Sequence, residues 1–467
     1  MANLETLSPA ELIATIVELR GLNKELKRQN EELRREIDEL RRGGGRSAAP
    51  FSKGRRKENP KPPGRKPGEG LFSRREEPVS EALSQVRIEV PVTCHSCPDC
   101  GGALGESATE IASNTDLPEQ PRPVVRHYEV EVRRCRQCGR KVRGRHKELA
   151  PDQFGATAHR LGVRLKAAAH VLHYGFGVPA RKVPPILEEL TGIKVTQGAL
   201  TQDALKQTGR RVGNAYQDLR AGVRQAPVVH TGDTGWRTGG EAAQLMVFET
   251  DRETVYQIRS RHRNEEVREV IPSDYAGVMV TDRGKSYDAD ELSAVAQQKC
   301  LSHLIRNTGE VVKEKRGPAR RFGVPLKALL QEGLRLWHDH KQGNALDYAT
   351  EVARIERELT HHLRHRVLGD EDNQRLLDGI GLQHDRGHVL RSLHQPGIEP
   401  TNNRAERALR PAVIARKVSH CSKNQRGAED FMAFTSLAQT FRKRIGTSLT
   451  DAFRVLLQQQ FSQTASP

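Results

Sequence analysis

The stretch VVHTGDTGWR, from Val228 to Arg237, gives the strongest indication of the fold in this sequence. It starts as an apolar strand and turns polar at Asp233, and two further strand-like runs follow before residue 260. A later stretch, GVMVTDRG from residue 277, reads as an apolar strand that ends in Asp282. Short apolar or alternating runs of this kind predict β-strands. We therefore expect a sheet with a carboxylate at the ends of two strands.

A third carboxylate lies in the block TNNRAERALRP, which starts at Thr401. Thr401 or Asn402 can cap a helix here, and Asn403 and Glu406, three residues apart, then share one helix face. Phosphodiester cleavage and transfer proceed well with two magnesium ions about 3.5–4 Å apart. Such hard cations prefer carboxylate oxygens as ligands. The candidate catalytic residues and Mg²⁺ ligands are therefore Asp233, Asp282 and Glu406.

Basic side chains accompany Glu406 and are expected to contact the phosphates of a nucleic acid. These candidate DNA-binding residues are Arg404, Arg407, Arg410, Arg416 and Lys417. Between Asp282 and Glu406 the pattern is helical, which predicts a helical insertion at about 305–395. Eight of the 18 histidines fall between His338 and His394, but their irregular spacing favours solvated or phosphate-facing residues over a metal site.

Residues 154–224 read as helices joined by short glycine-containing turns, as in a helix-turn-helix. The polar side chains of the last helix that could read bases are Gln197, Thr201, Gln202 and Lys206. A plain helical packing domain is the alternative interpretation. A further helical segment is predicted at 421–467.

Residues 86–150 are predicted to form a β-rich, zinc-ribbon-like module. Two CxxCG motifs supply four thiolates for a tetrahedral, structural Zn²⁺ with no open position for catalysis. The ligands are Cys97, Cys100, Cys135 and Cys138. Cys94 competes for the first pair, but the glycines that follow Cys100 favour the later one. The alternating residues from Val124 to Val132 are expected to form a strand of this module.

Leucine recurs at every seventh position from Leu12 to Leu40, and the intervening core positions are Ile16, Asn23, Asn30 and Ile37. This heptad pattern predicts a parallel, two-stranded coiled coil at 8–42, and hence a homodimer. A single amphipathic helix packed on its own domain is the alternative. Residues 43–80, rich in Pro, Gly, Lys and Arg, predict a disordered basic linker that either lies on DNA or is only a tether.

The composition fits a nucleic-acid partner. The chain has 467 residues, with 76 Lys and Arg against 59 Asp and Glu, and a net charge of +17. Such an excess favours a polyanion. No run of about 18 apolar residues is present and the first residues lack a signal-peptide pattern, so we expect a cytoplasmic, nucleoid-associated protein that does not enter a membrane. The seven cysteines are then expected to be thiols or metal ligands.

The order of these features resembles the transposases of the bacterial insertion-sequence-66 (IS66) family over nearly the whole chain. Those enzymes are of the DDE type. The resemblance implies an α/β multidomain fold in which an RNase H-like, mixed-sheet catalytic core with a helical insertion occupies 225–420. The coiled coil, the zinc-ribbon-like module and the helical DNA-binding segment would precede it. By matching position, Asp282 would be the second catalytic acid and Glu406 the third. Cys300 and His303 match a cysteine–histidine element of such cores, to which we assign a structural role.

One position departs from the family pattern. An acidic pair normally precedes the Thr-Gly-Trp of the first strand, and here that pair reads Gly232-Asp233. A step of one residue along a strand points to the opposite face of the sheet. Either a bulge or a twist at Gly232 lets Asp233 reach the metal, or this copy is catalytically impaired.

We therefore expect a transposase that cleaves DNA at the ends of its element and joins the freed 3′-hydroxyl to target DNA. The coiled coil at 8–42 would pair two subunits, and accessory proteins of the same element are possible partners. A DNA-binding accessory protein or impaired copy without chemistry is one alternative. A metal-dependent nuclease that cleaves without rejoining is the other.

Overall fold

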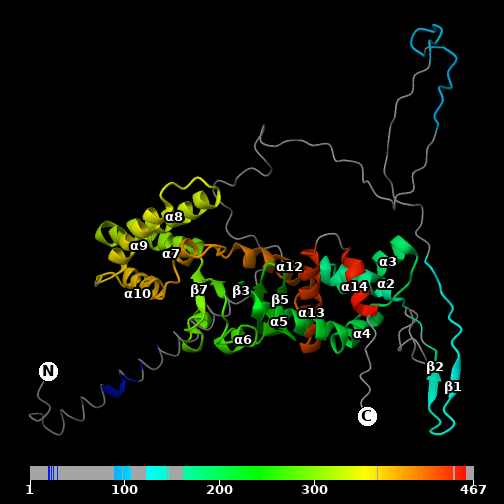
Figure 1. Ribbon diagram of the computed structural model, residues 1–467, viewed down its shortest axis with the longest axis horizontal. Coiled ribbons are helices and arrows are strands. Elements are labelled where there is room, and N and C mark those ends of the chain that lie inside the picture. The colour runs from blue at the N-terminus through cyan, green and yellow to red at the C-terminus, as the bar shows by residue number, and fades with distance from the viewer. Residues whose placement is uncertain are drawn as a thin grey trace, which may run out of the picture. The chain divides into compact units, whose positions relative to one another are not determined.

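A computed structural model of the chain describes residues 19–21, 23, 25, 29, 89–96, 98–106, 123–144, 146, 161–364, 366–444 and 448–458 (Figure 1). Contacts divide the chain into two compact units, Met1–Asp116 and Leu117–Pro467. Of the predicted coiled coil at 8–42 only a few positions are described, all of them helical, and the predicted linker at 43–80 lies outside the described residues. No helix in the described ranges is long and apolar enough to cross a membrane.

A five-stranded mixed sheet forms the centre of the second unit. Its strands are β3 (Val228–Thr238), β4 (Glu241–Glu249), β5 (Thr254–Arg259), β6 (Val278–Thr281) and β7 (Ala296–Lys299). They lie in the order β5-β4-β3-β6-β7. Strand β4 is antiparallel to both β5 and β3, whereas β6 is parallel to β3 and β7 is parallel to β6. Positive φ angles at Gly239 and Gly240 close the tight β3–β4 turn. The α/β class with a mixed sheet is thus confirmed.

Helices cover this sheet on both faces. Leu245 to Phe248 of β4 are completely buried, as expected of a strand with helices on either side. Helices α5 (Arg211–Gln225), α12 (Asn403–Ser419), α13 (Gln425–Arg442) and α14 (Leu449–Gln458) contribute to one hydrophobic cluster with the strands. The cluster buries apolar area from parts of the chain that lie more than 200 residues apart.

Helix α13 lies along the outer edge of β5 (Figure 1). The backbone N–H groups of Thr254 and Tyr256 donate to the hydroxyls of Thr440 and Ser436, at 3.0 and 2.9 Å. An uncovered edge strand is open to pairing with another chain, and α13 prevents this. The described helices of the predicted C-terminal helical segment at 421–467, α13 and α14, therefore pack as part of the sheet's own core.

The helical segment before the sheet joins the same core. It comprises α2 (Val163–His170), the π-helical turn η3 (Val171–Gly175), the 3₁₀ turn η4 (Ala180–Lys182), α3 (Val183–Thr191) and α4 (Gln197–Thr208). Gly192, with φ 69°, ends α3, and the Thr196 hydroxyl accepts the Ala199 N–H to cap α4. Asp203 of α4 pairs with Lys166 and His170 of α2 at 2.9 Å each, and all three side chains are buried.

The insertion between β7 and α12 has its own hydrophobic cluster. Its helices are α7 (Leu301–Glu314), α8 (Gly317–Lys341), α9 (Tyr348–Leu363), α10 (Glu371–Asp385) and α11 (Arg391–His394). Figure 1 shows them as a bundle beside β7. The shorter elements between β5 and β7 are α6 (Asn264–Arg268), η5 (Lys285–Tyr287) and η6 (Asp290–Leu292).

A small antiparallel hairpin carries the second CxxC motif. Its strands are β1 (Val132–Arg134) and β2 (Lys141–Arg143). The strand predicted from Val124 to Val132 differs, because regular pairing begins only at Val132. The alternation of apolar and polar residues indicated extended chain but not where it pairs. The tight turn from Cys135 to Gly139 fixes where the two strands can pair.

Candidate active site

Alternating residues of β3 point to opposite faces of the sheet, and the two faces have different neighbours. Thr231 and Asp233 lie on one face, where the Thr231 hydroxyl is 3.3 Å from the Tyr287 hydroxyl and Asp233 Oδ1 is 3.3 Å from His262 Nδ1. His262 Nε2 is in turn 3.2 Å from Ser286 Oγ. The Asp233 carboxylate is therefore held on the side of η5.

Gly232 and Thr234 lie on the opposite face, against α12. A Cβ atom at position 232 would lie 3.6 Å from Ala405 Cβ and from Leu409 Cδ1, both on α12. Arg416, on the same helix, donates to the Thr234 hydroxyl at 3.0 Å. The β3–β4 pairing runs without interruption through Gly232 and Asp233, and Gly232 is not in the left-handed region. Neither a bulge nor a twist of β3 brings Asp233 to the α12 side.

Asp282 follows β6 directly, in a tight turn. The Gly284 N–H donates to Asp282 Oδ1 at 2.8 Å. A Cβ at Gly284 would lie 3.0 Å from that oxygen and 3.1 Å from the Tyr287 ring, so glycine allows the turn to close. Burial raises the pKa of Tyr287 far above its usual value, and the charges of Asp282 and Asp233 add to this effect. Both strand carboxylates thus lie in the electrostatic environment of Tyr287.

Glu406 lies on α12 in a different environment. Its Oε1 is 3.8 Å from His303 Nε2, and its side chain is 48% exposed. Asn403 is exposed as well, which agrees with the predicted shared face. Glu406 is therefore open to solvent, with His303 as its cationic neighbour when the imidazole is protonated.

Two residues fasten the elements that carry the acids. The Cys300 N–H donates to the Thr281 carbonyl at 2.8 Å, and Cys300 Sγ accepts the Asn402 N–H at 3.2 Å. The Asn402 side chain donates to the Thr231 carbonyl at 2.7 Å. The end of β6, the start of α7, the start of α12 and the middle of β3 are thereby joined. Asn402 was predicted as a possible cap, but its side chain makes no capping bond, because it binds β3 instead.

The Cys300–His303 pair has perturbed proton affinities. Burial alone would raise the pKa of Cys300, but hydrogen bonds from His303 and from the Asn402 backbone outweigh it and lower that pKa. The pKa of His303 is raised, chiefly by its hydrogen bond with Cys300. The two shifts have the same cause, since a thiolate and an imidazolium stabilise each other.

The positions of the three candidate acids fit a bound Mg²⁺ only in part. No group of three or more His, Cys, Asp or Glu side chains in the described part of the chain is close enough to hold a metal ion. Asp282 and Glu406 stand on elements that Cys300 and Asn402 join, whereas Asp233 is paired with His262 on the other face of β3. A carboxylate at position 232 would face α12, and glycine stands there.

The five predicted DNA-binding residues have different environments. Arg416 is committed to Thr234 and to the Gly235 carbonyl, and Arg404 to Asp251 at 2.5 Å. The other three are exposed along one side of α12, together with Glu406, and they are Arg407, Arg410 and Lys417.

The polar residues predicted to read bases are all exposed on α4. They are Gln197, Thr201, Gln202 and Lys206. The opposite side of α4 packs on α2 and α3 through a small apolar cluster that includes Leu200. One face of α4 is thus free in the described chain.

The glycine that ends each CxxCG motif has a turn conformation. These glycines, Gly101 and Gly139, have φ of 74° and 69°, the left-handed conformation that glycine adopts easily. Backbone N–H groups of Cys138 and Gln137 lower the pKa of the Cys135 thiol. Cys97 lies outside the described residues, so zinc binding stays a prediction.

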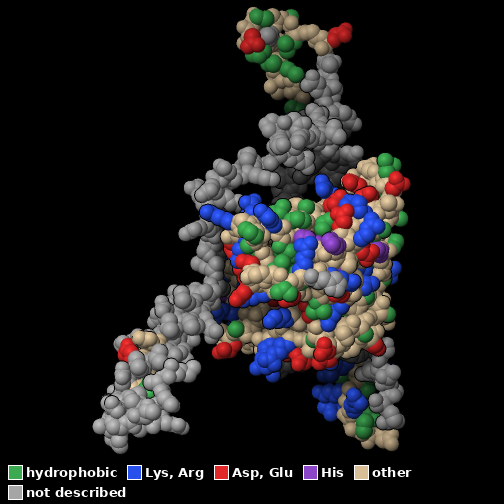
Figure 2. All heavy atoms as spheres, turned by 90° about the vertical axis from the view of Figure 1, so that its left-hand side faces the viewer, with side chains coloured by type: hydrophobic (Ala, Val, Ile, Leu, Met, Phe, Trp, Pro, Cys, Tyr) green, Lys and Arg blue, Asp and Glu red, His purple; other side chains and the backbone are tan. Residues whose placement is uncertain are grey.

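The described histidines of the insertion have separate partners rather than a shared centre. His362 Nε2 is 2.8 Å from the Phe322 carbonyl, His384 Nε2 is 2.7 Å from the Thr360 hydroxyl, and His388 Nδ1 is 3.0 Å from Gln383. These three are buried, so the solvated or phosphate-facing role predicted for this group is wrong for them. Figure 2 shows basic and acidic side chains interspersed on the face it presents.

Sequence reasoning missed four residues of this region. His262 and Tyr287 contact the strand acids, Asn402 joins α12 to β3, and Lys299 is a fully buried lysine of β7 that pairs with Asp288 at 2.7 Å. Lys299 gave no sequence signal, because it lies in the polar strand sequence AQQK; only the fold shows that this lysine is buried and paired. The other three depend on contacts between distant segments.

The comparison with known families agrees with this geometry. The model of the transposase IS66 family matches residues 159–430, more than half of the chain. The protein therefore belongs to the transposase IS66 family, a family of DDE-type transposases that act by nucleotidyl transfer. No curated protein matches the chain.

Proposed function

We propose that this protein is the DNA transposase of an insertion sequence, with an RNase H-like core that cleaves element ends and transfers them to target DNA. The observation that carries this proposal is the junction made by Asn402 and Cys300. It joins β3, the end of β6 and the start of α12, which are the three elements on which a DDE-type enzyme carries its acids. The order β5-β4-β3-β6-β7, with three antiparallel strands followed by two parallel ones, supports the core assignment.

Each residue has a proposed role at this site. Asp282 and Glu406, with Asp233 as the remaining acid, are the residues that would hold Mg²⁺. When bound, the metal activates the attacking oxygen and stabilises the leaving oxygen of the phosphodiester. His303 positions Glu406, and its interaction with Cys300 raises the pKa of His303. His262 fixes the orientation of Asp233.

DNA would lie along the exposed side of α12. Arg407, Arg410 and Lys417 follow Glu406 on that side, so they would neutralise phosphates next to the reacting one. The exposed face of α4 would read sequence at the element ends. The remaining parts of the proposal are structural Zn²⁺ bound by the CxxC motifs, a homodimer formed through the coiled coil and accessory proteins of the same element.

The glycine at position 232, which faces α12, favours a second candidate function, that of a DNA-binding protein with little catalytic activity. If the first metal ligand must come from that face, the chain binds element DNA but cleaves it poorly. Such an impaired copy would act as a DNA-binding accessory protein. A nuclease that does not rejoin is the third candidate.

Strand transfer by the purified full chain tests the proposal. We expect Mg²⁺-dependent joining of element ends to target DNA, which Asp282→Asn and Glu406→Gln abolish. Asp290→Asn, at an exposed acid in η6, is the matched control and retains wild-type activity. Full activity of Asp282→Asn would refute the metal assignment. Cleavage without joined product would favour the nuclease, and DNA binding without cleavage the accessory protein.

A further inference from the structure

We infer that a basic pocket between α12 and α13 binds a backbone phosphate of DNA, an inference that rests on the proposed function and extends it beyond the exposed side of α12. The pocket has a volume of about 270 Å³ and is bounded by β4, β5, α12 and α13. One water occupies about 30 Å³ of liquid, so a tetrahedral phosphate group fits with room for waters. Its wall combines residues from distant parts of the chain, such as Glu249 and Lys443.

The lining is strongly positive. Four of the side chains that line the pocket are cations and only one is a carboxylate, Glu249. The cations are Arg404, Arg407, Arg442 and Lys443. Both oxygens of Glu249 are already engaged, since Oε1 lies 2.7 Å from Lys443 Nζ and Oε2 accepts the Thr254 hydroxyl at 2.6 Å. An excess of positive charge is therefore left for an incoming anion.

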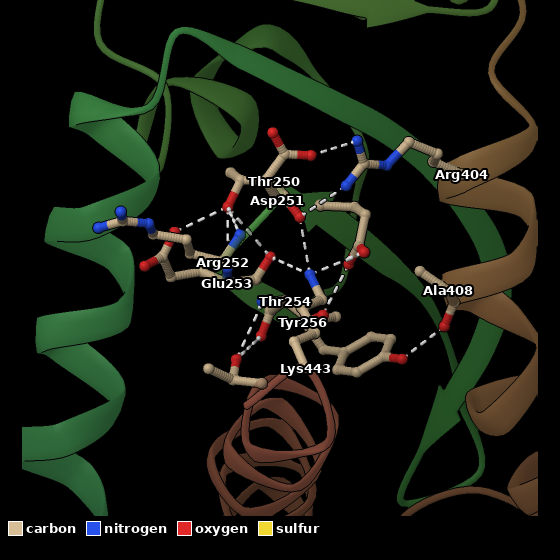
Figure 3. A network of polar contacts seen from close by, with 11 residues as sticks. Thr250, Asp251, Arg252, Glu253, Thr254, Tyr256, Arg404, Ala408 and Lys443 are labelled. Atoms are coloured by element: carbon tan, nitrogen blue, oxygen red, sulfur yellow. Dashed lines mark hydrogen bonds and ion pairs between the residues drawn. The ribbon is translucent and has the colours of Figure 1, made fainter. Parts of the chain in front are cut away.

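The cations on the wall are held in place by the protein. Figure 3 shows Arg404 reaching the β4–β5 turn from α12 and Lys443 reaching it from the end of α13. Lys443 Nζ donates to the carbonyls of Thr250 and Glu253 at 2.8 Å each, and Arg404 binds Asp251 and the Thr250 carbonyl. Side chains that are already ordered lose little entropy when an anion binds.

Arg442 is fixed in a similar way, and Arg407 is the mobile member of the set. The Arg442 guanidinium donates to the Gly175 carbonyl at 2.6 Å and lies 5.0 Å from the centre of the Phe176 ring. Arg407 is exposed and has no ion pair or hydrogen bond within the described residues. It is therefore free to close over a bound phosphate.

Gln439 supplies the observation that points to a ligand. Its Nε2 atom is buried at the pocket and has no hydrogen-bond partner among the described parts of the chain. Buried polar atoms are nearly always paired, so an unpaired donor needs an explanation. The Gln439 amide has to turn toward the pocket before a phosphate oxygen can accept this N–H, because Nε2 has almost no exposed surface in the unliganded protein.

The position of the pocket selects DNA as the source of the phosphate. Arg404 and Arg407 flank Glu406 within one turn of α12, where each residue advances about 1.5 Å along the axis. Arg407 lies about a quarter turn round the helix from Glu406, between the pocket and the exposed side of α12, so a phosphate anchored here would belong to DNA that runs along that side. Arg410 and Lys417 continue the positive surface along the same helix.

The test uses the full chain and three variants. Gln439→Leu removes the unpaired donor at similar size, Arg407→Ala removes the mobile cation, and Arg357→Ala removes an exposed arginine of α9 as the charge-matched control. Fluorescence anisotropy with a labelled duplex oligonucleotide over a series of salt concentrations gives affinity and salt dependence. Thermal unfolding with and without inorganic phosphate reports the pocket itself.

We expect Arg407→Ala to bind DNA about 10-fold more weakly and to lower the salt slope by about 1. Gln439→Leu should unfold at the same or a higher temperature, because a buried unpaired amide is gone, yet bind DNA more weakly and lose the stabilisation by phosphate. A purely structural role of Gln439 would instead lower stability and affinity together.

The two possible failures are distinguishable. If the wild-type protein binds DNA and both pocket variants bind like Arg357→Ala, with unchanged salt slopes and phosphate stabilisation, the pocket assignment is overturned and the proposed function stands. If the wild-type protein binds no DNA, the proposed function and the inference that rests on it both fail.

Discussion

Gly232 and Asp233 are adjacent on β3 and face opposite sides of the sheet. Position 232 looks toward Ala405 and Leu409 of α12, the helix that carries Glu406, while Asp233 is 3.3 Å from His262 on the other side. An acid at 232 and an acid at 233 are therefore not equivalent, although they differ by one residue.

If the glycine at position 232 removes the first metal ligand, Gly232→Asp should raise Mg²⁺-dependent strand transfer by about 100-fold, because one metal ligand contributes several kcal/mol to the transition state. The Cβ of the new side chain is accommodated, since it meets its nearest neighbours at 3.6 Å, an ordinary van der Waals distance, but the buried carboxylate should lower stability unless Mg²⁺ is bound, which thermal unfolding with and without Mg²⁺ measures. Strand transfer and Mg²⁺ affinity measure the effect. If Gly232→Asp changes nothing while Asp233→Asn abolishes activity, Asp233 is the working ligand after all.

The buried carboxyl of Asp430 on α13 should make stability depend on pH. The side chain is 4% exposed, and burial raises its pKa to about 6 from 3.8. A raised carboxyl pKa contributes stability that is complete below about pH 4 and is lost as the pH rises through about 6. Asp430→Asn removes this loss, so it should increase the free energy of unfolding at pH 7 by about 2–3 kcal/mol and change little near pH 4.

Urea unfolding at several pH values checks this prediction. Asp339→Asn, at an exposed acid of α8, is the control and should stay within about 0.5 kcal/mol of wild type throughout. Parallel stability curves for wild type and Asp430→Asn would show that Asp430 does not titrate in this range.

Substitutions of the neighbouring residues Arg416 and Lys417 on α12 should have different effects, one on stability and the other on DNA binding. Arg416 is bonded to Thr234 and to the Gly235 carbonyl, so Arg416→Ala should lower the free energy of unfolding by about 1–2 kcal/mol. Lys417 is exposed, so Lys417→Ala should leave stability unchanged and lower the salt slope of DNA binding by about 1. Reversed effects on melting temperature and affinity would contradict the proposed DNA path.

The purified protein should contain about one Zn²⁺ per chain, bound by thiolates. Backbone N–H groups already stabilise the Cys135 thiolate, so Cys135→Ser should lose the metal. Cys421→Ser, at a thiol outside the CxxC motifs, should keep it. Elemental analysis after dialysis against a chelator gives the metal content, and an equal zinc content in both variants would exclude Cys135 as a ligand.

Much of the fold could be predicted from local patterns. The strands around Asp233 and Asp282, the helix from Asn403 and the helices of the insertion all have apolar periods that act over a few residues. The division of the chain into separate cores could not be predicted from local patterns, because residues of α2 and α13 share one hydrophobic core with β4. Which apolar faces meet depends on the whole chain.

The positions of the candidate acids on strands and helix could be predicted from the sequence, whereas the residues that contact them could not. Asp282 and Glu406 stand where strand and helix patterns predicted them. The hydrogen bonds of Asn402 to Thr231 and of Cys300 to Asn402 join residues that lie more than 100 positions apart, and no local pattern encodes them.

The sequence by itself indicated the family and predicted three candidate acids on two strands and a helix. The fixed period of two of a β-strand also showed that Gly232 and Asp233 point to opposite faces. Only the tertiary structure decided that α12 covers the face of Gly232, that His262 binds Asp233, and that Gln439 meets four cations in one pocket. The physical reason is the range of the interactions. Periodicity acts between neighbours along the chain, whereas hydrogen bonds and ion pairs act between whatever residues the packed core brings together.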